Sequence, residues 1–388
     1  MPTDLGSLRV AIVHDWLVVS AGAERVLDEM LAVFPQAELF ALICAMPGQA
    51  ARTYRGRPVR TSFLQRLPFG VSHYRQWFPL HPTAIESLDL AGYDLVISSS
   101  HSVAKGVVTR SEQLHVSYCY SPMRYAWDLR EQYLEQAGLH GATALVARAL
   151  IARSRRWDLR TTSRVDAFLT LSRHIAARID RCYGRESVVV YPPVDLDAFP
   201  LSTAPRAGFV TASRLVPYKL VPMIVRAFAG MPDLALTVIG DGPDLEACRR
   251  AAAGHPQIRI LGHQPQSVLR DELTKAEAFV FAAQEDFGIA PLEAQACGTP
   301  VIAFGEGGAR ETIIDGTTGA FFDRQDEATI RDAVRRFRNG APISPDACRM
   351  NAERFAAVRF RTEFTTAIES ALATHAVRSV RSARAKAR

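Results

Sequence analysis

Two series of short apolar runs, each run followed by a longer amphipathic stretch, constrain this chain most strongly. The first series predicts strands at 10–13, 39–43, 95–98, 115–118, 168–171 and 188–191. The second predicts strands at 209–212, 235–239, 258–261, 279–282 and 301–304. Short apolar runs that alternate with helical patterns are typical of wound α/β domains with mainly parallel sheets. The length of 388 residues suits two such domains.

A dense group of prolines separates the two series. It consists of Pro192, Pro193, Pro200 and Pro205. Helix interiors and central strands do not tolerate this density, so we expect a linker here. We therefore predict an N-terminal domain at 1–195 and a C-terminal domain at 206–355. A helix at 356–375 would pack back toward the N-terminal domain, and 376–388 would form a disordered basic tail.

The cysteines and the hydropathy exclude several classes of protein. The six cysteines lie far apart and form no CxxC pair, which indicates neither a disulfide framework nor a zinc site and fits a reducing cytoplasm. No run of about 18 uncharged apolar residues occurs, and Asp4 and Arg9 precede the first apolar run. We expect neither a membrane span nor a cleaved signal peptide.

The formal charge of +6 is concentrated in few places. Residues 376–388 hold five cations and no acid, and residues 141–185 hold ten Arg against three Asp. Within the latter, Arg153, Arg156, Arg160 and Arg164 have the spacing of one helical face. This face is either solvated and paired with Asp158 and Asp166, or attracted to anionic lipid.

A pair of glutamates flanks a predicted helix in the second domain. The stretch 284–300 reads QEDFGIAPLEAQACGTP and follows a buried strand. Pro291 suits the first turn and Gly298 suits the end, so the helix should cover 289–297. Glu285 would precede the helix and Glu293 would lie in its first turn. Carboxylates beside free N–H groups suit a nucleotide sugar, although they would equally suit a solvated surface and the helix dipole.

Two cations follow the first strand of the same domain. Arg214 and Lys219 lie in the loop after 209–212. There they would either reach phosphates, Arg with a planar fork and Lys with a point charge, or remain surface cations.

Together these residues carry a resemblance to a known family. The segment 213–219, the GDGP at 240–243, the Glu-x7-Glu of Glu285 and Glu293, and the AxxCGTPVIA at 294–303 occur in the family's order and spacing. Over about residues 8–370, the chain resembles the large retaining glycosyltransferase family four. The resemblance implies an α/β fold of the GT-B type, in which two Rossmann-like domains face each other across a deep crevice.

The resemblance also implies a donor site in the second domain. Arg214 and Lys219 would neutralise the donor diphosphate, and Glu293 would hold the ribose. Glu285, together with the backbone of Phe287, Gly288 and Ile289, would hold the donor sugar. The chain departs from the family at Pro222, where many relatives have Asp. The GDGP lacks dinucleotide-fingerprint spacing and is interpreted as a turn.

In the first domain, the residues of interest follow the first and third predicted strands. Gly22 lies in a small-residue turn from Ser20 to Ala23 that would let a backbone approach a phosphate, or would simply connect strand and helix. His101, in SSSHSVAKGV, resembles the family's active-site His that contacts the donor sugar. Asp15 would accept a hydrogen bond from an acceptor hydroxyl or from nearby backbone amides.

A further segment resembles a mannosyltransferase-like branch. The run 118–129, YCYSPMRYAWDL, is similar to that branch's HTPMRYxWD, with Tyr120 where the branch often has His. Arg124 and Tyr125 would meet an anionic, sugar-bearing acceptor, with Tyr118 and Trp127 as stacking surfaces, unless the run is an aromatic core loop. The mixture of aromatics and cations at 63–82 suits either a membrane interface or a buried helix pair.

These observations support one hypothesis and leave others open. We expect a metal-independent, retaining glycosyltransferase without a cofactor, in which Glu285 and His101 are catalytic. By resemblance it would move mannose from GDP-mannose onto a polyprenyl-diphosphate-linked saccharide for surface polysaccharide. It would be cytoplasmic and peripheral on an anionic inner membrane face. The alternatives are a UDP-sugar donor, or a sugar-nucleotide epimerase or hydrolase. Nucleic acid is not an expected partner, since no base-reading motif accompanies the cations.

Overall fold

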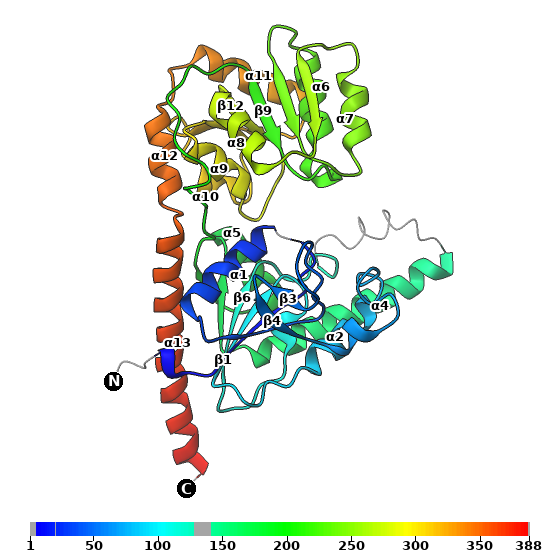
Figure 1. Cartoon of the computed structure of the whole chain (residues 1–388), viewed down its shortest axis with the longest axis vertical. Coiled ribbons are helices and arrows are strands. Elements are labelled where there is room, and N and C mark those ends of the chain that lie inside the picture. Colours follow the sequence, from blue (N-terminus) through cyan, green and yellow to red (C-terminus); the bar gives the residue numbers. More distant parts are fainter. Residues whose placement is uncertain (1–4, 20, 128–140, 387–388) are drawn as a thin grey trace. The chain divides into compact units, whose positions relative to one another are not determined.

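The computed structural model describes residues 5–19, 21–127 and 141–386, and it divides into two compact units (Figure 1). Unit 1 comprises Met1–Tyr191 and Phe360–Arg388, and unit 2 comprises Pro192–Arg359. Unit 1 is therefore discontinuous in sequence.

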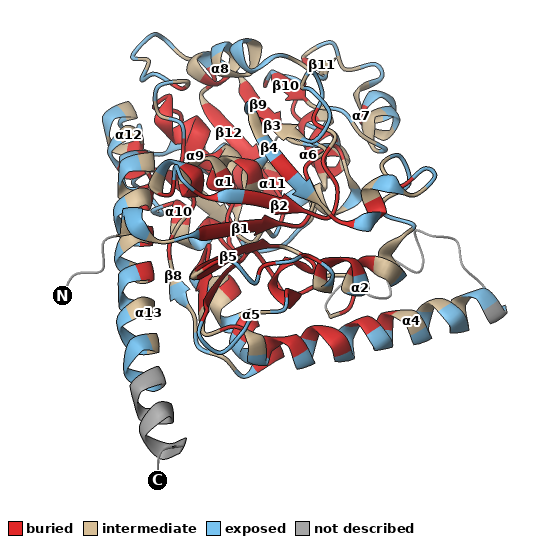
Figure 2. Ribbon diagram, turned by 60° about the horizontal axis from the view of Figure 1, so that its bottom comes forward, coloured by how far each residue is buried: buried red, intermediate tan, exposed pale blue. Residues whose placement is uncertain are grey.

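The described residues of unit 1 form an eight-stranded sheet in the order β3-β4-β2-β1-β5-β6-β7-β8. The strands are β1 (Val10–His14), β2 (Glu38–Ala41), β3 (Thr53–Tyr54), β4 (Arg57–Thr61), β5 (Leu95–Ser100), β6 (Leu114–Cys119), β7 (Ala167–Thr170) and β8 (Val188–Val189). Only the β3 and β4 pair is antiparallel, and the other pairs are parallel. Every residue of β1, β5 and β6 is buried, and Figure 2 shows β1 and β5 in red.

Helices and short 3-10 turns surround this sheet. They are η1 (Leu5–Ser7), α1 (Gly22–Val33), η2 (Phe63–Arg66), η3 (Phe78–Leu80), α2 (His81–Glu86), η4 (Ala104–Gly106), α4 (Gly141–Arg160), η5 (Thr161–Arg164), α5 (Arg173–Tyr183) and α13 (Ala357–Lys386). From Phe360 onward α13 belongs to unit 1. Its rings enter the core there, since the Phe360 and Phe364 centroids lie 6.0 Å from Tyr118 and 6.4 Å from Phe34, respectively.

Unit 2 is a six-stranded parallel sheet in the order β11-β10-β9-β12-β13-β14. Its strands are β9 (Phe209–Ala212), β10 (Leu236–Ile239), β11 (Ile258–Gly262), β12 (Ala278–Phe281), β13 (Val301–Phe304) and β14 (Gly319–Phe322). Its helices are η6 (Pro217–Lys219), α6 (Val221–Ala229), α7 (Leu245–Ala252), α8 (Gln266–Lys275), α9 (Ile289–Ala296), α10 (Ala309–Thr312), α11 (Glu327–Asn339) and α12 (Pro345–Glu353). Counted within the unit, the strand order is 3-2-1-4-5-6, the order of a Rossmann fold.

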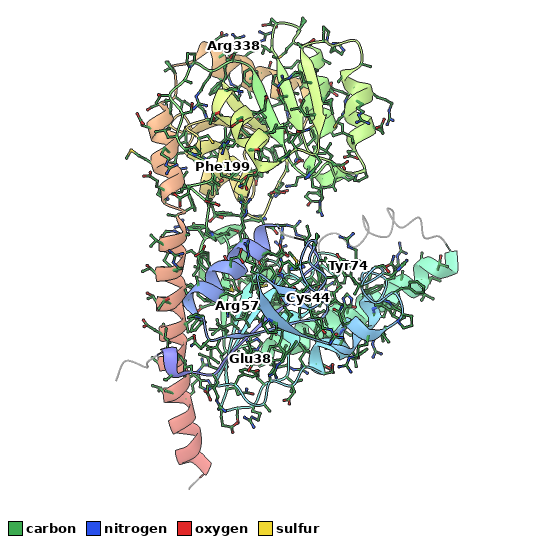
Figure 3. The ribbon with its side chains drawn as sticks, in the orientation of Figure 1. Glu38, Cys44, Arg57, Tyr74, Phe199 and Arg338 are labelled. Carbon is green, nitrogen blue, oxygen red and sulfur yellow. The ribbon has the colours of Figure 1, made fainter. Side chains whose placement is uncertain are left out.

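The proline-rich segment is not a free linker, which corrects our expectation. The chain passes between units at Tyr191, and the following residues already pack on unit 2. Phe199 (Figure 3) is fully buried in the core of unit 2, and Ser202 N–H donates to the Cys297 carbonyl at 3.2 Å. Prolines exclude regular secondary structure here, but they do not prevent the apolar side chains between them from being buried.

The end of the chain also differs from the prediction. Helix α13 continues through Lys386, where we expected a disordered tail from 376. The physical reason is local: no Pro or Gly interrupts 357–388, and Ala and Arg, which favour helices, are frequent there.

Candidate functional site

In both sheets, the predicted site residues other than Arg124 and Tyr125 follow the two strands between which the strand order reverses. In unit 2 this point lies between β9 and β12, whose helical connections run in opposite directions. Arg214 and Lys219 follow β9, and Glu285 follows β12. Ligands of open α/β sheets bind beyond the carboxyl ends of the strands at such a switch point. The topology therefore gathers residues that are 66 positions apart in sequence, as Lys219 and Glu285 are.

Lys219 and Glu285 form a hydrogen-bonded ion pair at this switch point. Lys219 Nζ donates to Glu285 Oε1, and the two side chains are only 14% and 20% exposed. The Lys219 ammonium also lies 5.7 Å from the centre of the Phe281 ring at the end of β12. A fixed cation with little water around it attracts an anionic group more strongly than a solvated cation does.

Arg214 stands at the same loop but has a different partner. Its side chain is exposed, and its Nη2 atom donates to the Tyr218 hydroxyl at 3.2 Å. The loop ends at Leu220, a non-glycine residue with φ of 56° that caps α6. Such left-handed backbone costs free energy in a non-glycine residue and is often retained at functional sites. Of the two predicted phosphate ligands, the structure thus joins Lys219 to Glu285 and directs Arg214 to Tyr218.

The backbone of Phe287, Gly288 and Ile289 forms the start of α9. Gly288 is the N-cap, with φ of 90°, a conformation that other residues adopt only with strain. The N–H groups in the first turn of a helix have no intrahelical acceptor and favour an anion or a polar ligand. The glycine therefore allows the chain to turn from Glu285 directly into these N–H donors.

Two further glycines hold this loop, and the sequence reasoning missed them. The Gly308 N–H donates to the Glu285 carbonyl at 2.8 Å. A Cβ atom on Gly307 would lie 2.4 Å from the Glu285 carbonyl oxygen, and one on Gly308 would lie 2.3 Å from the Phe287 Cα atom. Neither position accepts a side chain without movement of the Glu285 loop. The run GEGG after the predicted strand at 301–304 was the available signal.

Glu293 corrects our prediction about α9. It is the fifth residue of the helix, so it lies in the second turn and not in the first. Its side chain is buried, with 5% exposure.

In unit 1 the switch point lies between β1 and β5, and Asp15 follows β1 there. Its buried carboxylate accepts four backbone hydrogen bonds from the loop after β5. Oδ2 accepts from His101 N and Ser102 N at 2.6 and 2.9 Å, and Oδ1 accepts from Val103 N and Ala104 N at 2.6 and 2.7 Å. Of the two roles we considered for Asp15, the structure has the bond to backbone amides.

His101 is held at the end of β5 by this carboxylate. Its Nδ1 atom lies 3.1 Å from Asp15 Oδ2 but without hydrogen-bond alignment, and 30% of its side chain is exposed. Burial lowers the pKa of the His101 imidazole, although the Asp15 charge opposes the shift. The ring is therefore neutral near pH 7, and it can accept as well as donate a hydrogen bond.

Gly22 is the first residue of α1, and Ser20 lies outside the described residues. Ala21 is extended, with φ of −139°, a conformation that does not require glycine. The Glu24 side chain accepts from Ala21 N at 2.8 Å, and its Oε1 atom lies 3.5 Å from His14 Nε2. Burial opposes ionisation of Glu24, but the contacts with His14 and Ala21 outweigh it and lower its pKa.

The segment 118–127 is largely internal, which corrects the proposed stacking surfaces. Tyr118 is fully buried and donates to the Val190 carbonyl at 2.7 Å. Trp127 Nε1 donates to Asp158 Oδ2 at 2.8 Å. Arg124 and Tyr125 are half-buried, and the Tyr125 hydroxyl lies 3.4 Å from Ser102 Oγ in the loop that follows β5.

The Arg-rich face also differs from its prediction. Asp158 is buried and pairs with Lys105 of η4 at 2.8 Å, not with the arginines. Arg164 lies beyond α4, in η5, and binds Glu86 at 2.8 Å. Arg153, Arg156 and Arg160 remain as an exposed face of α4.

Among residues 5–19, 21–127 and 141–386, no group of three or more His, Cys, Asp or Glu side chains is placed to hold a metal ion. Within that same part of the chain, no helix combines the length and hydrophobicity needed to cross a bilayer.

The arrangement of strands defines a class of fold. A solved structure of Anabaena Alr3699/HepE, in complex with UDP, has a TM-score of 0.66 and 17% identity over 94% of this chain and 100% of its own. AviGT4, a glycosyltransferase involved in avilamycin A biosynthesis, has a TM-score of 0.55 and 16% identity over 94% of this chain and 98% of its own. At these identities the likeness establishes the fold, which is that of the GT-B glycosyltransferases.

The sequence adds a match to a known family over part of the chain. Residues 178–355 match the model for glycosyl transferases group 1. It is 32% identical to a GDP-mannose-dependent alpha-(1-6)-phosphatidylinositol monomannoside mannosyltransferase of Mycolicibacterium smegmatis, over 44% of this chain and 52% of that protein. It is 34% identical to a D-inositol 3-phosphate glycosyltransferase of Mycobacterium sp. strain KMS, over 36% of each chain. The chain thus matches about half the length, or less, of these curated relatives.

Proposed function

We propose that the protein is a retaining glycosyltransferase that moves a hexose from a nucleotide sugar onto an acceptor hydroxyl. The observation that carries the proposal is the Lys219 and Glu285 pair, held at the switch point of a Rossmann-type sheet beside the start of α9. A cation and the N–H groups at the start of a helix suit a diphosphate, and a carboxylate suits sugar hydroxyls.

The proposed chemistry assigns one role to each group. Lys219, Arg214 and the N–H groups of α9 stabilise the charge that develops on the leaving diphosphate. Glu285 accepts hydrogen bonds from the donor sugar, Glu293 contacts the ribose, and His101 orients the sugar. The acceptor hydroxyl attacks from the leaving-group face, and its proton passes to the departing phosphate oxygen. The new glycosidic bond replaces the bond to the phosphate, and the reaction requires neither a metal ion nor a cofactor.

For the donor we propose GDP-mannose. Support comes from relatives whose names specify GDP-mannose, at 32% and 30% identity. A UDP-sugar is the alternative, because several neighbours in fold were solved with UDP. A thermal-shift comparison of GDP, UDP, GDP-mannose and UDP-glucose separates the two, since a ligand at 100 times its dissociation constant stabilises by about 2.7 kcal/mol. A shift with UDP-glucose alone would replace our donor.

For the acceptor we propose a polyprenyl-diphosphate-linked saccharide used in surface polysaccharide synthesis, met at an anionic cytoplasmic membrane face. Exposed arginines on α4 support this, as does Phe69, which is 73% exposed in a strained backbone with φ of 56°. Polybasic surfaces gain about 1 kcal/mol per cation near anionic lipid. Flotation with anionic vesicles checks it: the full chain should float, and Arg153→Glu with Arg156→Glu should reduce flotation. No association of the full chain would remove the membrane from the proposal.

Glu285→Ala tests the site itself. It should lower transfer by at least about a hundredfold, since it removes contacts to the reacting sugar, while the fold is retained. Glu246→Ala in α7 is the matched control, because Glu246 is exposed and forms an ion pair with the surface residue Arg249. Nucleotide release without acceptor, unaffected by acceptor addition, would indicate a hydrolase or epimerase instead.

A further inference from the structure

Three aromatic rings gather around Trp16, and one of them is that of His101. The Trp16 ring centre lies 4.6 Å from that of His101, 5.3 Å from that of Tyr74 and 5.9 Å from that of His81. We call these four residues the Trp16 cluster. Its members come from the loop after β1, the segment before η3, the start of α2 and the loop after β5. The fold of unit 1 therefore assembles an aromatic surface at its switch point.

The cluster is held in place by hydrogen bonds that do not involve its exposed parts. His81 is buried, and its Nε2 atom lies 2.9 Å from the Tyr74 carbonyl oxygen, which fixes the backbone of Tyr74. Burial lowers the pKa of His81, so its ring is neutral near pH 7. On the other side, Asp15 fixes the backbone of His101 through the amides of its loop. A binding surface with fixed rings loses little conformational entropy when a ligand stacks on it.

The rings of Trp16 and Tyr74 are only half-buried, although they pack against the core of unit 1. The side chain of His101 is also partly exposed. Aromatic faces carry negative partial charge, so they attract the weakly positive C–H groups on the apolar face of a hexose. The half-exposed rings can thus stack on the apolar face of a hexose, while the neighbouring imidazole forms a hydrogen bond with a hexose hydroxyl.

Positive charge borders the cluster. Arg75 is exposed, its Nε atom donates to the Tyr74 hydroxyl at 3.1 Å, and its guanidinium lies 5.3 Å from the centre of the Tyr74 ring. Arg124 adds positive potential at His101. Cations at the border of an aromatic surface suit a sugar that carries phosphate.

We propose that the Trp16 cluster is the acceptor subsite, where the terminal sugar of a phosphate-linked saccharide stacks on Trp16 and Tyr74 while Arg75 meets its phosphate. The proposal rests on the proposed function and names residues that lie outside the segment 118–127. The acceptor sugar is recognised by stacking, and the phosphate by charge.

Trp fluorescence offers a direct measurement, because all four tryptophans of the chain lie in unit 1. The full chain is titrated, without any donor, with farnesyl-diphosphate-linked glucose, galactose and mannose and with the three free sugars. We expect a fluorescence change and saturable binding for at least one diphosphate-linked sugar, and weaker binding of its free counterpart. Trp16→Leu and Tyr74→Leu should each weaken binding about tenfold, and Trp16→Phe should restore most of it, as judged by thermal shift.

Trp77→Leu is the matched control, since Trp77 packs against the same core from the neighbouring segment. Equal weakening by Trp77→Leu, or unchanged binding in Trp16→Leu and Tyr74→Leu, would overturn the proposal. So would the absence of binding of all the diphosphate-linked sugars to the wild-type chain. These outcomes are distinct from a failure of the proposed function, which is judged by the nucleotide shifts in unit 2.

Discussion

The Asp15 side chain positions the loop that carries His101, and this role does not require contact with a substrate. Its two carboxylate oxygens satisfy four consecutive amides after β5, so the position of His101 depends on it. The sequence located Asp15 but could not choose between substrate and backbone as its partner, because that choice depends on a loop 86 residues away.

Asp15→Asn should therefore impair both stability and catalysis. The amide would point an NH2 group at backbone N–H donors and leave buried groups unpaired, at a cost of about 1–3 kcal/mol each. We expect a lower melting temperature of unit 1 and a fall in kcat that exceeds any change in the donor KM. Asp94→Asn is the control, since Asp94 binds Arg9 at the surface. Unchanged kcat in Asp15→Asn would show that His101 does not need this support.

His115 predicts a loss of stability in acid. It is fully buried, between Ser98 Oγ and the Arg164 carbonyl, each 2.9 Å away, and burial lowers its pKa to about 4 from 6.5. The unfolded chain takes up a proton below about pH 6.5, whereas the folded chain does not until about pH 4. The contribution of His115 to the unfolding free energy should thus be complete above pH 6.5. It should decrease by ~3 kcal/mol toward pH 4 and change no further below that pH.

Urea unfolding at several pH values, followed by Trp fluorescence, measures this change in unit 1. His115→Gln should flatten the curve between pH 6.5 and 4, whereas His73→Gln, at an exposed position, should not. A curve in His115→Gln as steep as that of the wild type would assign the acid loss to other groups.

At the scale of elements, the sequence predicted the strands that consist of apolar runs, including the edge strands β8 and β11, and missed three others. Continuous apolar runs mark β1, β5, β6, β9, β12 and β13 within one or two residues of their observed bounds. It missed β3, which has only two residues, β4, which is polar, and β14, which contains Gly319. Gly319 is required there, since a Cβ atom would lie only 2.0 Å from the Val301 carbonyl oxygen.

The candidate site was predictable where it depends on strand ends, and not where it depends on packing. Lys219 and Glu285 follow strands that the hydropathy already located. The burial of Glu293 and the internal bonds of Tyr118 and Trp127 depend on which helix covers them. Periodicity assigns residues to a helix but does not show which other element packs against that helix.

Lys105 of η4 and Asp158 of α4 form a buried ion pair in unit 1. Both side chains are at most 1% exposed; Lys105 Nζ also donates to the Asp158 carbonyl and to Thr161 Oγ1, at 2.6 and 3.0 Å. Lys105→Met should destabilise unit 1 by about 3–5 kcal/mol, because it leaves a buried carboxylate without its cation. Arg153→Met on exposed α4 should change stability little. Equal effects in urea unfolding would show that the buried pair contributes no more than a surface charge.

At the scale of the whole molecule, unit 1 depends on α13, although α13 follows unit 2 in the sequence. Phe360, Phe364 and Ile368 are fully buried. Ending the chain at Ala356 should therefore prevent compact folding of unit 1, with red-shifted Trp fluorescence and aggregation. Ending it at Arg378 keeps all three side chains and should leave the fluorescence native. A native spectrum for the shorter chain would show that α13 is dispensable.

The discontinuity of unit 1 also sets an order of events during synthesis. Its last helix leaves the ribosome only after the whole of unit 2 has been made. At about 5–20 residues per second, the first 191 residues wait roughly ten to thirty seconds for the segment that covers Phe34 and Tyr118. During that time this apolar surface is open to chaperones or to other nascent chains. Unit 1 is thus translated first but completes its folding last.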